Sequence, residues 1–122
     1  MGKFILTGEQ RYIGYIRTLE GFTSALLKED DIIIGSRIFE DMDIYIRTYL
    51  CEENLELFVR EDWIDEETAD KSRGLRDTFC SLQKGSPELW NLESVKTAEE
   101  WRILMYLSEE IRNSLNYIPD ME

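Results

Sequence analysis

The stretch that decides the fold class is residues 7–28, TGEQRYIGYIRTLEGFTSALLK. Thr7 and Gln10 have the spacing of a capping box, in which each side chain bonds the other residue's backbone N–H at the start of a helix. The apolar residues that follow recur every three or four positions, at Ile13, Ile16, Leu19, Phe22, Leu26 and Leu27. Because this is the period of one helical face, we predict a helix over residues 8–28.

Four more segments carry helix signals of the same kind. They span residues 37–50, 65–83, 86–92 and 97–117, and their first turns begin in that order at Ser36, Asp65, Ser86-Pro87 and Thr97. Residues 54–60 fit both a strand and a helix, and we favour a helix because a lone strand would have no partner. The sequence therefore predicts an all-α bundle of five or six helices in a single domain, residues 1–122.

The residue inventory excludes several classes of site. The longest uninterrupted apolar run covers only residues 103–107, whereas a membrane span needs roughly 20 residues. With no signal-like segment, we expect a cytoplasmic protein. The sequence contains no histidine, which excludes catalytic Ser-His and Cys-His arrangements. Cys51 and Cys80 form no metal-ligand or redox pattern, so we expect both to be buried, reduced thiols.

The net charge of −12 is concentrated in the middle of the chain. Residues 29–70 hold fifteen acidic side chains and three arginines, while the segments before and after carry net charges of +2 and −2. Such a charge disfavours direct binding to nucleic acid or anionic lipid. One interpretation is a solvated acidic face that keeps the protein soluble. The other is a surface for a basic partner, since acids packed this closely repel one another at a cost in stability.

Trp63 is the single residue that the charge pattern picks out. Acidic residues flank it on both sides, and an aromatic side chain inside a charged rim is typical of a protein-binding hot spot. The other interpretation, which we slightly favour, is a place in the core beneath the helix that begins at Asp65. The candidate partner-binding residues are Asp41, Asp43, Glu61, Asp62, Trp63, Asp65, Glu66, Glu67 and Asp70.

Other candidate sites lack parts that their chemistry requires. Asp41 and Asp43 have the spacing that opens a calcium loop, but neither the glycine nor the closing acid of such a loop follows. No glycine-rich phosphate loop accompanies the carboxylates, so we expect no enzyme, no cofactor and no metal. The basic residues on the helix over 65–83 favour an ion-pairing counterface within the protein over a nucleic-acid site; they are Lys71, Arg73, Arg76 and Lys84.

With these features the chain resembles the immunity proteins of bacterial toxin systems, including those of contact-dependent growth inhibition. The resemblance covers the whole chain and lies in size, helical pattern, lack of histidine and one strongly acidic segment. It implies a non-enzymatic inhibitor that binds a cognate toxin domain, frequently a basic nuclease, and occludes its active site or a neighbouring surface. The alternative is a helical adaptor or regulatory subunit that binds a protein partner, including a second copy of itself, through an apolar groove.

Overall fold

The computed structural model describes residues 6–121, and every regular element in that range is helical. The elements are α1 (Gly8–Glu20), the 3₁₀ turn η1 (Ser24–Lys28), α2 (Asp31–Ser36), the π-helical turn η2 (Arg37–Asp41), α3 (Met42–Tyr49), α4 (Glu52–Arg60), α5 (Glu66–Gly85), α6 (Leu92–Thr97) and α7 (Glu99–Arg112). Since α2, η2 and α3 follow one another without a break, the described part of the chain has six helices. The all-α prediction is confirmed.

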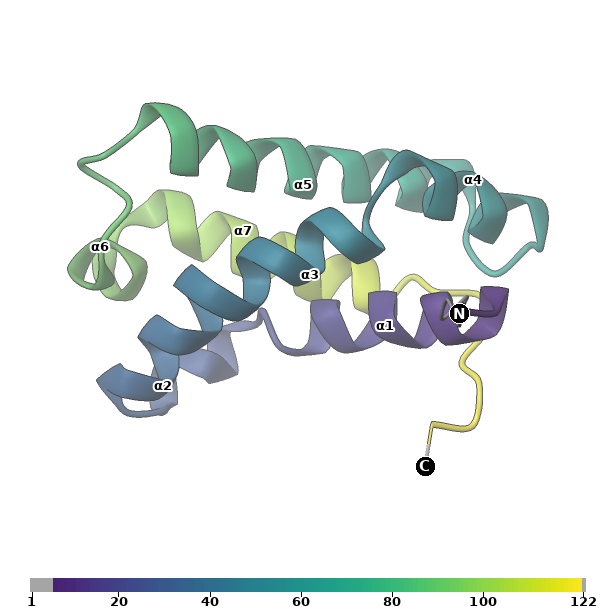
Figure 1. Ribbon diagram of the computed structural model, residues 1–122, viewed down its shortest axis with the longest axis horizontal. Helices are drawn as coiled ribbons and strands as arrows, with labels where there is room; N and C mark the ends of the chain where they lie inside the picture. Colours follow the sequence, from purple (N-terminus) through teal and green to yellow (C-terminus); the bar gives the residue numbers. More distant parts are fainter. Residues whose placement is uncertain (1–5, 122) are drawn as a thin grey trace, which may run out of the picture.

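The helices surround α1, which packs against α3, α4 and α7. Figure 1 shows α5 along one side of the molecule with α7 antiparallel to it, and α3 crossing diagonally over α1. The chain leaves α7 as an extended tail that returns to the first turns of α1. None of the described helices has the length and apolar character required to cross a membrane.

The first helix begins as predicted and ends early. Both bonds of the Thr7–Gln10 capping box form. The prediction that the helix runs to residue 28 is wrong, because it ends at Gly21, whose N–H bonds back to the carbonyl oxygens of Arg17 and Leu19. The guanidinium of Arg37 then binds the Gly21 carbonyl oxygen at 3.0 Å, which fixes the bend that leads into η1.

The second helix differs most from its prediction. It begins at Asp31 with Asp30 as N-cap, not after Ser36, and it contains the π turn η2. Its buried residues lie four apart: Ile34, Ile38, Met42, Ile46 and Leu50. On an ideal α-helix, four such steps would rotate the last residue roughly 160° away from the first. The wider π turn absorbs one residue, which keeps all five side chains on the core face.

Three later boundaries also move. The ambiguous segment is helix α4, as favoured, but residues 87–90 form turns and the short helix α6 begins later, after Asn91. The capping box expected at Thr97 is wrong, because its hydroxyl donates to the Glu93 carbonyl oxygen inside α6. The last helix ends at Arg112 rather than near residue 117. Cys51 and Cys80 are free thiols but only half-buried, which corrects the expectation that both are buried.

Two aromatic clusters fill the core at opposite ends of α1. One joins Tyr12 and Tyr15 to Phe58, with ring centroids 4.9 and 5.1 Å away. The other joins Phe22, Phe79 and Trp101 edge to face, and Trp90 and Phe39 continue the same edge-to-face packing behind them. Trp101 is fully buried in the core, whereas Trp90 is only partly buried and packs against it.

Gly14 lets α1 and α3 approach closely. A Cβ atom built at this position would collide with carbon atoms of the Tyr49 ring, which lies against the α1 backbone. Ring and backbone therefore make a contact that no larger residue at Gly14 could preserve.

We predict that Gly14→Ala destabilises the protein by about 1–3 kcal/mol, because the added methyl must displace the Tyr49 ring. The matched control is Gly74→Ala in the middle of α5, where a Cβ would meet no atom within 4 Å. That change should instead stabilise by up to about 1 kcal/mol through helix propensity. Urea unfolding of both variants measures the difference, and two shifts of the same sign would contradict this account of the α1–α3 contact.

Candidate partner-binding surface

The structure does not bring the nine predicted residues together. Asp41 and Asp43 lie in η2 and α3, where they pair with Arg37 at 3.7 Å and Arg47 at 3.1 Å. Asp43 also accepts a hydrogen bond from Gln83, near the carboxyl end of α5. Glu66 opens that same helix, so about 25 Å of helix separates it from Gln83. Asp41 and Asp43 are therefore not part of one surface with the other candidates.

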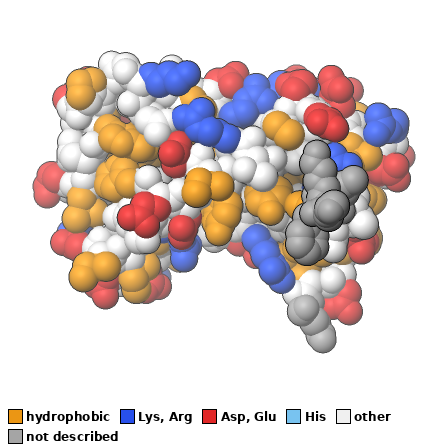
Figure 2. Space-filling view, in the orientation of Figure 1, with side chains coloured by type: hydrophobic (Ala, Val, Ile, Leu, Met, Phe, Trp, Pro, Cys, Tyr) orange, Lys and Arg blue, Asp and Glu red, His pale blue; other side chains and the backbone are white. Residues whose placement is uncertain are grey.

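The remaining acids form one exposed group, which we call the acidic end. Its members are Glu61, Asp62, Asp65, Glu66, Glu67 and Asp70, around the turn from α4 to α5. Acidic side chains are visible around this turn in Figure 2. Glu67 and Asp70 pair with Lys71 and Arg73 of α5. Within residues 6–121, no lysine or arginine lies at ion-pair distance from the other four.

Asp65 and Asp62 contribute to the backbone conformation of the acidic end as well as to its charge. Asp65 is the N-cap of α5, and the bond that its carboxylate accepts from the Thr68 N–H holds its pKa below the usual value. Asp62 follows the end of α4 with φ of 65°, the left-handed conformation that favours glycine. The N–H groups of Asp62 and Trp63 bond back to Val59 and Phe58, which completes a Schellman-type helix end.

Three of the four basic residues predicted to pair within the protein do so, and Lys84 has no ion pair among the described residues. Arg73 bonds Glu52 of α4 at 2.6 Å, and Arg76 lies 3.6 Å from the same carboxylate. Lys71 reaches Glu110 of α7 at 2.6 Å. These contacts tie α5 to its two neighbours and neutralise acids on the flank of the helix. The hydrogen bond from Arg73 is the main reason that the pKa of Glu52 is lowered.

Trp63 lies at the edge of the core rather than free in solvent. Its half-buried ring packs against Tyr12 at 4.9 Å and Tyr117 at 5.6 Å between centroids. Its carbonyl oxygen accepts bonds from the Tyr12 hydroxyl and the Asn116 N–H. Trp63 therefore packs against the core, as one of the two interpretations expected. Only the exposed part of its side chain is accessible to a partner.

The tail after α7 contributes to this surface, and it was not predicted from the sequence. Asn116 donates to the Asp62 carbonyl oxygen at 3.3 Å, and the Tyr117 hydroxyl donates to Glu9 at 2.8 Å. The tail therefore crosses the aromatic cluster beside the acidic end. The segment up to residue 117 had been assigned to the last helix, but Pro119 in the sequence was a signal for an extended chain.

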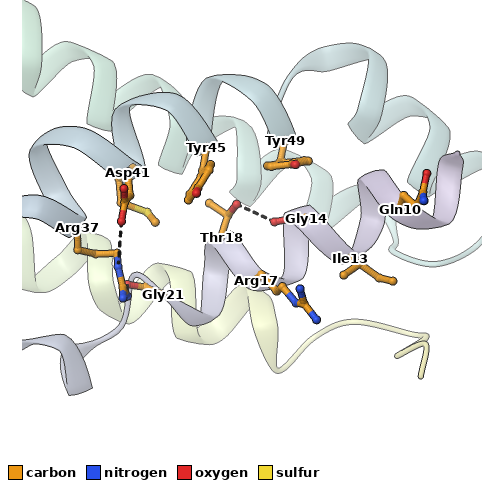
Figure 3. Close-up of a pocket in the computed structure, with 11 residues that line it drawn as sticks. Gln10, Ile13, Gly14, Arg17, Thr18, Gly21, Arg37, Asp41, Tyr45 and Tyr49 are labelled. Atoms are coloured by element: carbon orange, nitrogen blue, oxygen red, sulfur yellow. Dashed lines mark hydrogen bonds and ion pairs between the residues drawn. The ribbon is translucent and has the colours of Figure 1, made fainter. Parts of the chain in front are cut away.

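A second feature is a hollow of about 500 Å³ between α1 and α3 (Figure 3). Ile13, Arg17 and Thr18 of α1 line one side, and Tyr45 and Tyr49 of α3 line the other. Gly14 and Gly21, seven residues apart on one side of α1, are the sequence features that mark this face of the helix. Glycines at this spacing indicate a close approach of another segment but do not predict a hollow beside it.

We predict that Asp62→Gly stabilises the fold by about 0.5–1 kcal/mol, because glycine adopts the left-handed conformation without the steric cost of a Cβ. Asp62→Val should destabilise, since branching at Cβ makes that conformation costlier. Thermal or urea unfolding tests both variants. Equal stability of the glycine and valine variants would show that the helix end has a different conformation.

The lowered pKa of Glu52 gives a pH-dependent prediction. Its contribution to stability is present above the usual pKa of 4.5 and is lost as pH falls through the lowered pKa. Glu52→Gln should therefore melt below the parent at pH 7, and the difference should vanish at about pH 2. The control is Glu56→Gln, an exposed acid on the same helix with no ion pair among the described residues. A constant difference between parent and Glu52→Gln across this range would exclude the ion pair as its cause.

Among residues 6–121 no three acidic or cysteine side chains are grouped closely enough to hold a metal ion. Comparison with models of protein families, with curated proteins and with solved structures finds no match. The acidic end and the hollow between α1 and α3 are therefore the features from which a function can be inferred.

Proposed function

We propose that this chain is a non-enzymatic inhibitor of the immunity-protein kind, which binds a basic toxin domain through its acidic end. The observation that carries the proposal is the clustering of unpaired acids. Elsewhere in residues 29–70, five of nine acids pair with bases, as Asp31 does with Lys96 and Glu52 with Arg73, and the other four are divided among three separate stretches of the chain. Four exposed acids of the acidic end have no such partner among the described residues.

Electrostatics supports a basic partner for this surface. The turn between the helices holds Glu61, Asp62, Asp65 and Glu66 within six consecutive residues, which gives a concentrated negative potential. A nuclease-type active site is built to bind phosphate and therefore presents the complementary charge. Negative side chains placed there would occlude the site and accelerate association by steering.

The fold gives this surface a rigid support. The Schellman-type end of α4, the Asp65 cap of α5 and the bonds from Asn116 hold the turn on three sides. A preformed surface loses little conformational entropy on binding, so more of its interaction energy appears as affinity. The exposed edge of the Trp63 ring adds an apolar contact inside the charged rim.

A second candidate function is a helical adaptor that binds a protein segment through a groove. The observation that favours it is the hollow between α1 and α3, together with exposed apolar residues on the helix that borders it. Ile32 is 83% exposed, Ile44 60% and Tyr45 42%. Salt separates the two candidates, because steered binding weakens as ionic strength rises and apolar burial hardly changes.

The test of the main proposal reverses three acids of the acidic end, Asp62, Glu66 and Asp70, to lysine. The matched control reverses three exposed acids elsewhere, Glu29, Glu40 and Glu88, and so changes the net charge equally. The binding partner is the protein encoded by the adjacent reading frame, where the immunity-type resemblance places the toxin. Association and dissociation rates are measured at low and high salt, after thermal melting shows that both variants fold.

The triple reversal should slow association by about tenfold or more at low salt, with a smaller change at high salt. The control should slow it much less, because the distribution of charge rather than its total steers the partner. Equal effects of the two triple variants would show that the acidic end is a solvated face and not a binding surface. No binding to a folded product of the adjacent frame would also overturn the proposal.

A further inference from the structure

The hollow between α1 and α3 combines two kinds of side chain that rarely meet on so acidic a protein. Tyr45 and Tyr49 form an aromatic wall, with ring centroids 6.2 Å apart and planes inclined at 49°. Arg17 and Arg37 lie in its lining from opposite helices. Figure 3 shows the tyrosines pointing from α3 toward α1, and Figure 2 shows apolar side chains on this face with basic ones beside them.

The charge of the lining is the reverse of the protein's. The lining contains two guanidinium groups and one carboxylate, that of Asp41, which lies 3.7 Å from Arg37. The lining therefore carries a net positive charge on a chain whose total charge is −12. Guanidinium groups bind carboxylates with directed, charge-assisted hydrogen bonds, so a ligand with carboxylates fits this lining.

The chain itself shows what kind of group Arg17 binds. Its guanidinium donates at 3.0 Å to the carbonyl oxygen of Met121, in the extended tail that returns to α1. An extended stretch of polypeptide therefore already contacts Arg17, although no residue of the tail belongs to the lining of the hollow. Arg17 could exchange this carbonyl for an acceptor on another extended segment without any movement of the helices.

An extended peptide can contact both the arginines and the tyrosines of the lining. The π turn η2 begins at Arg37 and ends at Asp41, and both residues line the hollow. Extended peptides place alternate side chains on opposite sides. A segment with alternating acidic and apolar residues would therefore offer carboxylates to the arginines while its apolar side chains pack on Tyr45 and Tyr49.

We propose that the hollow between α1 and α3 is a docking site for an extended, acidic peptide segment of a partner protein, held by Arg17 and Arg37 and by the tyrosine wall. The inference deepens the second candidate function and does not depend on the acidic end. A second copy of this chain and a peptide of opposite charge are outcomes that the test below separates from it.

The probe is a fluorescein-labelled nonapeptide in which aspartate alternates with phenylalanine or leucine between glycine and serine ends. The control peptide carries lysine in place of each aspartate. Binding to the full chain is measured by fluorescence anisotropy and mapped by amide chemical shifts. Sedimentation of the chain without peptide reports whether it self-associates, and amide shifts that change with chain concentration report whether the same face is involved.

The acidic peptide should bind with a Kd below about 1 mM and shift the amides around Ile13, Tyr45 and Tyr49. Arg17→Gln should weaken binding by about tenfold, and Arg37→Gln by a similar factor. Arg102→Gln, an exposed arginine on α7 outside the hollow, is the matched control and should change little. Arg17→Gln keeps the test decisive if Arg37→Gln does not fold, because Arg37 also fixes the bend at Gly21.

Absence of binding at about 1 mM acidic peptide would overturn the proposal. So would equal binding of the lysine peptide at the same amides, or a dimer whose interface covers Tyr45 and Tyr49. If both proposals hold, the lysine peptide should shift only the amides of residues 61–70. The acidic peptide should shift only the amides around the hollow. The two proposals can therefore fail separately.

Discussion

The contact between Gly14 and the Tyr49 ring is the constraint on which the arrangement of the helices depends. It brings α3 onto α1 at a position where any Cβ would collide with the ring. With α3 held there, the apolar residues four apart from Ile34 to Leu50 reach the core only if the helix rotates less than an ideal α-helix. The π turn supplies that correction, and its first and last residues then line the hollow beside the contact.

Local signals predicted much of the fold. The Thr7–Gln10 capping box and the Asp65 cap depend on residues three apart, so the sequence contains all their parts. The π turn could not be predicted by a search for a uniform helical period. The strict spacing of four between apolar residues from Ile34 onward was the sequence feature that indicated it. The end of the last helix depends on Tyr117 bonding Glu9 and Tyr12, which no local pattern records.

The candidate surface was predictable in composition but not in extent. Residues 29–70 were recognised as the acidic part, yet which acids remain available depends on bases far away in the chain. Glu52 pairs with Arg73, and Asp31 pairs with Lys96 across 65 positions. Eight acids of this segment have no ion pair among the described residues, and four of the eight lie within six consecutive residues at the turn between α4 and α5, where Trp63 closes the aromatic cluster. Folding thus turns a diffuse excess of charge into a local one, which is the physical basis for a partner of opposite charge.

Hydrogen–deuterium exchange of the chain, alone and bound to the product of the adjacent reading frame, tests the central claim most directly. If the acidic end is the interface, binding should slow amide exchange in residues 58–70, where the helix end and the first turn of α5 become shielded. Exchange in α2 and α6, at the opposite end of the molecule in Figure 1, should stay unchanged. Protection confined to α7 or to the α1–α3 face, with none in residues 58–70, would contradict the account.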